Sequence, residues 1–387
     1  MSADRRNLPS LTALRAVAAL LVFGFHAVGL LAMLGRGHLG RAAGKLFVSG
    51  PTGVSFFFLL SGFVLTWSHR GDVADSRRPL PGAPTAFWRQ RAARILPAYV
   101  AAWILGYAVL TGLHHRPPTG GSLASLMLVQ SWTSDPNVLF AVNIVAWSLA
   151  VEAFFYVAFP YLLPSLLRLE PRLRPMLMLS LALIPLGLAV AEQLGHGSSG
   201  YLWLVAYFPL ARLPEFLIGA LLALEIREGR WRTIPLGPAL VFALAGYLLA
   251  GRVPAAFMWV VVTLVPFTVL IAAAAQADLA GRTTWLRHRA AGRLGAWSYS
   301  FYLLQVPIGL LVAHFWHPTD RSTMLQIAGF IGYLALTWAA AALLYRTVEM
   351  PLHARLRAQR IPPKTDVLPV PDPVTTPAGP SFEQAAS

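Results

Sequence analysis

Long apolar stretches separated by short polar segments make up most of this chain. An α-helix needs about 17–25 consecutive apolar residues to cross the hydrocarbon core of a bilayer. Ten stretches approach or reach that length, at residues 11–34, 52–68, 95–112, 138–163, 176–194, 202–224, 235–250, 254–276, 295–317 and 324–346. The pattern predicts an all-α fold, a polytopic membrane bundle of about ten transmembrane helices within residues 11–346.

Composition and charge agree with a membrane location and indicate which segments face the cytoplasm. Only 12% of the 387 residues are charged, whereas soluble proteins carry about 25%. If the N-terminus is cytoplasmic, the predicted inner segments hold 23 of the 31 Lys and Arg residues and the outer segments hold six. Cytoplasmic loops of membrane proteins carry this excess. The net charge of +15 therefore indicates topology and contact with anionic lipids rather than nucleic-acid binding, and both termini are predicted to be cytoplasmic.

The two ends of the chain and the missing residue types narrow the chemistry. Residues 1–10 and 347–387 are predicted to be a cytoplasmic N-terminus and tail, and seven prolines in residues 361–387 predict disorder there. The absence of cysteine excludes disulfides, thiolate metal sites and a cysteine acyl intermediate. Phosphate-loop, nucleophile-elbow and zinc motifs are also absent, so we expect no metal and no permanently bound cofactor.

Two ionisable residues interrupt the first apolar stretch. Arg15 and His26 are eleven residues apart, so a helix places them on nearly the same face, about 16 Å apart along its axis. Ionisable groups in hydrocarbon are costly and usually face a polar interior. We therefore expect both side chains to face one shared polar cavity, where His26 could act as a general base. The alternative is a structural histidine that bonds between helices.

The third predicted span begins with two arginines on one helix face. Arg91 and Arg94 are three residues apart, so their guanidinium groups could hold one phosphate-bearing ligand from two sides. The alternative is ordinary anchoring at the cytoplasmic face.

A carboxylate deep in the fourth span must be paired, protonated or part of a polar track. Glu152 could orient His26 during proton transfer, or it could form a salt bridge with Arg15 or Arg212. The sequence leaves both roles open.

Other interruptions have simpler explanations. Arg212 and Glu215 are three residues apart and should pair with each other, and Gly219 indicates close helix packing nearby. Small residues at Ser61–Gly62 favour packing, although the hydroxyl could line a pore. Glu349, near the end of the last span beside basic residues, could be purely structural.

Several sequence pieces, read in order, resemble the membrane-bound acyltransferase-3 family over about residues 8–355. They are SLTALRAVAALLVFGFHA, FFFLLSGFVL, FWRQRAARILPAY, WSLAVEAFFY, RLPEFLIGALLA, SYSFYLLQVPI and the EMP at 349–351. The family's arginine-x10-histidine pair falls on Arg15 and His26, and its R-x-x-R falls on Arg91 and Arg94. Its W-S-L-x-x-E falls on Trp147, Ser148, Leu149 and Glu152.

Two positions depart from that pattern. Gln305 stands where many family members have histidine, and Ala153 stands where a second acidic residue is common. A second imidazole is therefore not expected, and Glu152 is the single carboxylate of its motif.

The resemblance implies O-acyl transfer from acyl-CoA, acetyl or longer, as co-substrate to a hydroxyl of a sugar or glycosylated product. It implies a multi-pass enzyme of a bacterial plasma membrane. It looks closest to actinobacterial enzymes that acylate macrolide-type sugars, with cell-surface glycans as the other acceptor class. His26, Glu152 and Arg15 would be catalytic, and Arg91, Arg94 and Arg15 would bind the donor. Further contacts with substrate are expected from Ser61, Trp147, Arg212 and Glu349.

A second class of function fits the buried charges taken alone. A transporter or flippase uses intramembrane Arg, His and Glu residues to relay protons or to bind an anionic substrate. Measured acyl-CoA consumption, compared with substrate uptake into proteoliposomes, separates the two hypotheses.

Overall fold

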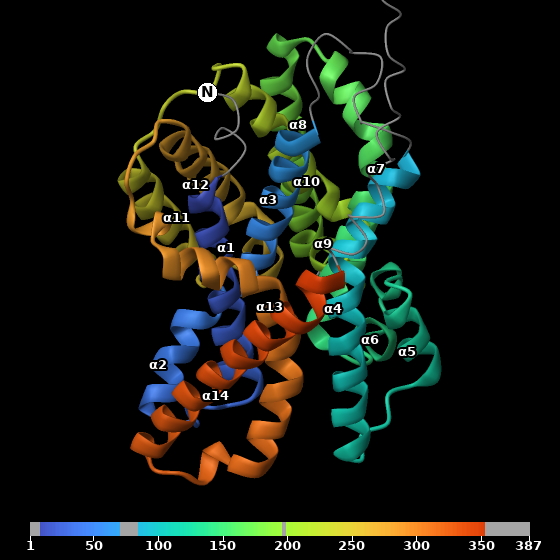
Figure 1. The fold of residues 1–387 in the computed structure, drawn as a ribbon, viewed down its shortest axis with the longest axis vertical. Coiled ribbons are helices and arrows are strands. Elements are labelled where there is room, and N and C mark those ends of the chain that lie inside the picture. Colours follow the sequence, from blue (N-terminus) through green and yellow to red (C-terminus); the bar gives the residue numbers. More distant parts are fainter. Residues whose placement is uncertain (1–7, 70–83, 196–198, 353–387) are drawn as a thin grey trace, which may run out of the picture.

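The long apolar stretches fold as helices that run between two ends of an elongated bundle (Figure 1). A computed structural model describes residues 8–69, 84–195 and 199–352. These residues contain helices and no strand. The α-helices are α1 Pro9–Gly24, α2 His38–Phe47, α3 Thr52–His69, α4 Pro84–Gly112, α5 Thr119–Leu126, α6 Pro136–Leu139, α7 Trp147–Arg168, α8 Arg174–Leu194, α9 Ser199–Ala206, α10 Pro209–Arg227, α11 Leu236–Ala250, α12 Val262–Leu279, α13 Arg289–Trp316 and α14 Thr323–Leu344. The all-α polytopic prediction is confirmed.

Nine helical stretches in the described part of the chain are long and apolar enough to cross a membrane. The tenth predicted span, 235–250, corresponds to α11, whose 15 residues fall short of that length. Helix α4 begins at Pro84 rather than at residue 95, because the basic segment before the apolar run is itself helical. The predictions for residues 1–7 and for the proline-rich tail lie outside the described residues.

Two glycines allow the closest helix contact near the centre of the bundle. A Cβ on Gly62 of α3 would lie 1.9 Å from the carbonyl oxygen of Phe216 in α10. A Cβ on Gly219 of α10 would lie 1.9 Å from the carbonyl oxygen of Leu59 in α3. Each glycine therefore admits the partner's backbone, as small residues do between membrane helices. The close packing predicted at both glycines is confirmed.

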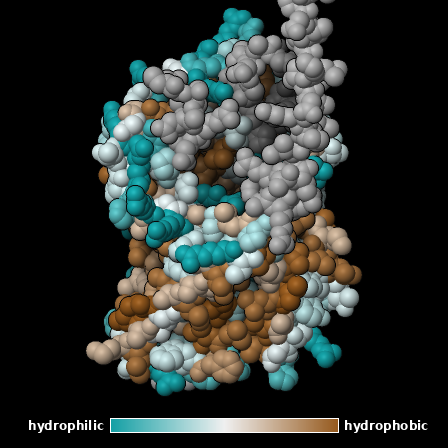
Figure 2. Space-filling view, viewed as in Figure 1, coloured by the Kyte–Doolittle hydropathy of each residue, from teal (hydrophilic) through white to brown (hydrophobic). Residues whose placement is uncertain are grey.

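The outer helices expose apolar side chains, as lipid-facing helices must. In α14 only 17% of the most apolar window is buried, compared with 78% for the stretch that contains α3. Figure 2 shows hydrophobic residues gathered over the part of the molecule where α14 lies. Exposed apolar residues of this helix include Met324, Ile331 and Leu343.

Three described segments are wound as π-helices, Phe25–Leu30, Phe257–Val261 and Tyr345–Glu349. Such segments are rare and are frequently found at functional sites. The first contains His26, and the third ends at Glu349. Both residues lie near the cavity described next but are not part of its lining.

Candidate functional site

A cavity lies between five helices, α1, α3, α4, α7 and α13. The space between these helices, including the part that is open to solvent, measures about 900 Å³. It is lined by Arg15, Val54, Phe57, Phe58, Leu60, Ser61, Val64, Leu65, Arg91, Arg94, Ile95, Ser148, Leu149, Glu152, Tyr156, Ser298, Tyr299 and Tyr302.

Three arginine residues line this cavity, and we refer to Arg15, Arg91 and Arg94 as the arginine cluster. Arg15 lies in the second turn of α1, and the other two lie in the first half of α4. Arg91 and Arg94 share a helix face and line the same cavity, as their spacing predicts. The guanidinium carbon of Arg91 lies 5.6 Å from the Phe87 ring centroid, and its buried Nε has no hydrogen-bond partner.

Glu152 faces the arginine cluster from α7 and accepts two hydroxyl hydrogen bonds on one oxygen. The Oγ of Ser61 donates to its Oε1 at 3.0 Å, and the hydroxyl of Tyr156 donates to the same atom. The carboxylate is close enough to Arg15 and Arg91 for electrostatic attraction. Glu152 is therefore held by two hydroxyls and acts as a counter-charge inside the cavity.

His26 lies elsewhere. It is not among the residues that line the cavity, although Arg15 is. Its Nδ1 lies 2.9 Å from the carbonyl oxygen of Val22, one turn earlier in the same helix, and the Gln305 side chain is its other polar neighbour. The expectation that Arg15 and His26 share this cavity is therefore wrong. A shared helix face does not mean a shared depth, because the two residues are about 16 Å apart along the axis.

The proposed contact between Glu152 and His26 is also not observed. The partners of Glu152 are Ser61 and Tyr156, while the imidazole is oriented by the Val22 carbonyl. A carbonyl oxygen can only accept, so Nδ1 carries the proton and Nε2 is left as the basic nitrogen.

Two polar residues of α13 lie one turn apart, Tyr302 in the cavity lining and Gln305 beside His26. The hydroxyls of Ser148 and Tyr302, both lining the cavity, lie 2.8 Å apart. One turn later in α13, Nε2 of Gln305 donates to the carbonyl oxygen of Tyr302 at 3.1 Å. The Oε1 of Gln305 is buried without a hydrogen-bond partner. Tyr302 thus lines the cavity and Gln305 neighbours the imidazole, and the hydrogen bond between them runs through the Tyr302 backbone carbonyl.

Two residues expected to contact substrate do not line the cavity. Arg212 is fully buried, and its Nε donates to Oε2 of Glu215 at 2.7 Å, which confirms the predicted pair. Its Nη2 also donates to the Oγ of Ser55 at 2.9 Å. Trp147 is buried among aromatic rings, with the Tyr207 centroid 4.8 Å from its own. In the structure Arg212 pairs with Glu215, and Trp147 packs against other aromatic rings.

Glu349 also lies outside the lining, directly behind Arg94. Its Oε1 is 2.7 Å from Nη1 of Arg94, and its Oε2 accepts a hydrogen bond from the Oγ of Ser300 at 3.0 Å. Ser61, by contrast, does line the cavity, as its position in a polar interruption suggested.

Several residues of this arrangement were missed by sequence reasoning. Tyr156 follows Glu152 by four residues, a spacing that places both on one helix face and is visible in the sequence. Ser300 and Tyr302 carry no comparable signal, because their partners lie on other helices. Among the described residues no group of three or more His, Asp or Glu side chains could hold a metal ion.

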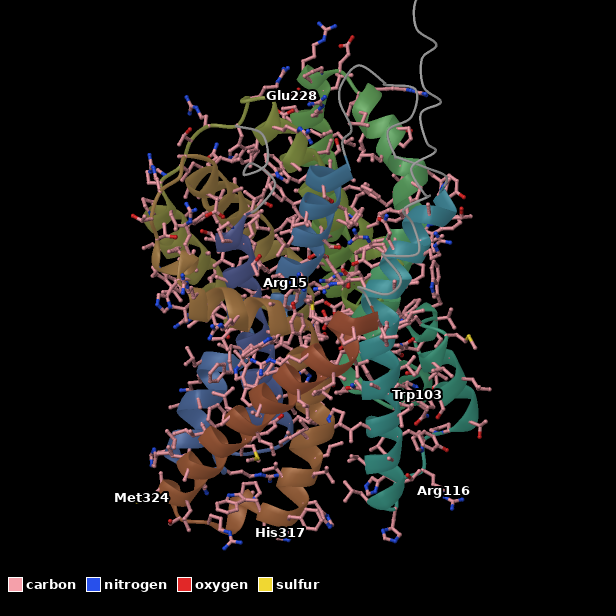
Figure 3. The ribbon with its side chains drawn as sticks, in the orientation of Figure 1. Arg15, Trp103, Arg116, Glu228, His317 and Met324 are labelled. Atoms are coloured by element: carbon pink, nitrogen blue, oxygen red, sulfur yellow. The ribbon has the colours of Figure 1, made fainter. Side chains whose placement is uncertain are left out.

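Figure 3 shows where the site lies along the bundle. Arg15 is in the middle, Glu228 is at one end, and Arg116 and His317 are at the opposite end. Glu228 belongs to a predicted inner segment, whereas Arg116 belongs to a predicted outer one. These two segments therefore lie at opposite ends of the bundle, and which end faces the cytoplasm stays a prediction.

Comparison with known proteins identifies the family. The model of the acyltransferase-3 family, described as an acyltransferase domain, matches residues 8–346. Acyltransferase MdmB of Streptomyces mycarofaciens is 33% identical, covering 95% of this chain and 96% of that protein. The exopolysaccharide production protein ExoZ of Rhizobium meliloti is 28% identical, covering 84% of this chain and 96% of that protein.

A third relative shares only part of its length. The O-acetyltransferase OatA of Staphylococcus aureus is 26% identical over 56% of this chain and 34% of that protein. No solved structure matches significantly. A family match across almost all of the membrane bundle, together with these bacterial relatives, shows that the chain belongs to the acyltransferase-3 family and is an acyl-transferring enzyme of a bacterial plasma membrane.

Proposed function

We propose that this enzyme transfers an acyl group from acyl-CoA to a hydroxyl of a sugar or glycosylated product. The names of two relatives, an O-acetyltransferase and an exopolysaccharide production protein, support O-acylation of carbohydrate. The observation that supports acyl-CoA as the donor is the arginine cluster, because three arginine residues line one cavity.

The arginine cluster suits the phosphates of acyl-CoA. Guanidinium groups bind phosphate oxygens with two parallel hydrogen bonds and keep their charge at any working pH. Arg15 and Arg91 lie toward the ends of α1 and α4 that the topology predicts to be cytoplasmic, the side where acyl-CoA is made available. Glu152 lowers the electrostatic repulsion among the three cations while the cavity holds no anion.

His26 is proposed as the general base. Its Nδ1 is committed to the Val22 carbonyl, so Nε2 can take the proton of the acceptor hydroxyl. The hydroxyl oxygen then attacks the thioester carbonyl, the carbon–sulfur bond breaks, and the imidazolium returns the proton to the leaving thiolate. The long pantetheine arm would have to pass the Ser148–Tyr302 pair to bring the thioester from the arginine cluster to His26.

Two acceptor classes follow from different observations. Resemblance to actinobacterial tailoring enzymes favours sugars of macrolide-type natural products. Similarity to an exopolysaccharide production protein favours a cell-surface glycan.

Comparative mass spectrometry tests the proposal. Secondary metabolites and glycans from cells with and without the gene are compared, and the expected result is one product class that lacks an acyl unit in the deletion strain. The purified enzyme should then consume acyl-CoA only when the deacylated product is added. Uptake of that product into proteoliposomes without acyl-CoA consumption would contradict the proposal and favour a transporter.

A further inference from the structure

Glu349 forms a three-helix contact behind the arginine cluster. Its carboxylate joins Nη1 of Arg94 in α4, at 2.7 Å, to the Oγ of Ser300 in α13, at 3.0 Å. Glu349 itself ends the π-helical segment that follows α14. The carboxylate is fully buried and does not line the cavity, whereas 31% of the Arg94 side chain is exposed and does line it.

The geometry leaves most of the Arg94 guanidinium available. Glu349 forms an ion pair with Nη1 alone, and the rest of this planar donor belongs to a side chain that is partly exposed and lines the cavity. Arginine has many rotamers, and fixing one costs entropy that a bound anion would otherwise have to offset. A buried partner that fixes the side chain before binding removes part of that cost.

We propose that Glu349, itself held by Ser300, is a positioning residue that preorganises Arg94 for the phosphates of the acyl donor. This inference rests on the proposed function, since it assumes that acyl-CoA binds at the arginine cluster. In this role Glu349 raises the affinity for acyl-CoA through Arg94 and does not contact acyl-CoA itself. The proposal goes beyond charge neutralisation, which Glu152 already provides from within the cavity.

The charge effect and the positioning effect have opposite signs, so one variant separates them. Removal of a negative charge near the cavity should strengthen anion binding by Coulomb attraction. Loss of the support for Arg94 should weaken it. Glu349→Gln keeps the side-chain shape and removes the charge, and our proposal requires weaker binding.

The experiment measures CoA binding by calorimetry to the full chain in nanodiscs. Glu349→Gln should weaken CoA binding about tenfold, Glu349→Asp should bind more tightly than Glu349→Gln, and Ser300→Ala should lose less than Glu349→Gln. The matched control is Glu225→Gln, which alters another buried arginine pair, Arg174–Glu225 at 3.3 Å, away from the cavity. That control should bind CoA as the wild type does.

Each outcome bears on one claim. If the wild type does not bind CoA, the donor site of the proposed function is wrong. If the wild type binds and a folded Glu349→Gln protein binds equally or more tightly, the positioning role is wrong. An equal loss in Glu225→Gln would show a general structural effect and would also overturn it. If Glu349→Gln does not fold, Ser300→Ala decides, because unchanged CoA affinity in that variant contradicts the proposal.

Discussion

The imidazole of His26 donates from Nδ1 to a carbonyl oxygen of its own helix, and this single contact leaves Nε2 as the nitrogen that can accept a proton. A distant carboxylate is not needed to choose the tautomer. The same side chain is buried and lies outside the arginine-lined cavity. Donor binding and proton transfer are therefore assigned to different residues, and they should be separable by mutation.

We expect His26→Ala to bind CoA with wild-type affinity and to lose acyl transfer by about 10²–10⁴-fold, the usual contribution of a general base. Calorimetry and initial-rate measurements on the same preparation provide the two values. His115→Ala is the matched control, because the Nδ1 of His115 lies 2.8 Å from the Leu113 carbonyl oxygen but the residue is exposed in a predicted outer segment. Full turnover by His26→Ala would rule out the base assignment.

The buried pair of Arg212 and Glu215 provides a second prediction for single residues. Arg212→Met leaves the Glu215 carboxylate buried without its cation, which should lower the free energy of unfolding by about 3–5 kcal/mol. Arg212→Met/Glu215→Gln should recover most of that loss, since neither partner is then charged. Denaturant unfolding measures both, and folded variants should bind CoA normally because neither residue lines the cavity. A folded, stable Arg212→Met protein without CoA affinity would instead show that Arg212 serves the donor.

At the scale of elements, the contact of α3 with α10 sets the position of Ser61. Gly62 and Gly219 bring the two backbones together, and Ser61 precedes the first of these glycines. The hydroxyl of Ser61 thereby reaches Glu152 on a third helix. Gly62, which packs against α10, and Ser61, which bonds to Glu152 in α7, are therefore neighbours in the sequence but face different helices.

Gly219→Ala should destabilise the protein by at least about 1–3 kcal/mol, because the added Cβ would overlap the Leu59 carbonyl oxygen. Gly187→Ala in α8 is the control, since nothing lies within 4 Å of its Cβ position. Denaturant titration of both variants should show a lower midpoint only for Gly219→Ala. Equal midpoints for the two variants would contradict the prediction, because α3 and α10 would then accommodate the added Cβ without loss of stability.

For the whole molecule, the distribution of basic residues predicts which end faces the cytoplasm. Glu228 of a predicted inner segment and Arg116 of a predicted outer segment lie at opposite ends of the bundle (Figure 3). The arginine cluster lies on the helices whose basic ends are predicted to be inside, so the proposed donor site is expected to open toward the cytoplasm, where acyl-CoA is available.

The absence of cysteine makes that sidedness directly testable. A membrane-impermeant maleimide should label Arg116→Cys and Arg321→Cys in intact cells, because both positions are exposed at the predicted outer end. Arg230→Cys and Arg293→Cys should react only after permeabilisation. Wild-type protein supplies the background, and the reverse labelling pattern would invert the topology.

Properties that depend on neighbours along one helix followed from the sequence alone. The apolar runs indicated the membrane helices, the spacing of Arg91 and Arg94 placed them on one face, and Arg212 with Glu215 formed the expected pair. Helical periodicity and hydrocarbon solvation act over a few residues or one span, so a single stretch of sequence contains the information.

Contacts between helices were decided only by the tertiary structure. Glu152 accepts a hydrogen bond from Ser61 of α3, and Arg94 pairs with Glu349 from the far end of the chain. The depth of His26 relative to the cavity likewise depends on how α1 and α13 are placed. Helix packing sets rotation, depth and neighbours across hundreds of residues, and no local periodicity encodes them.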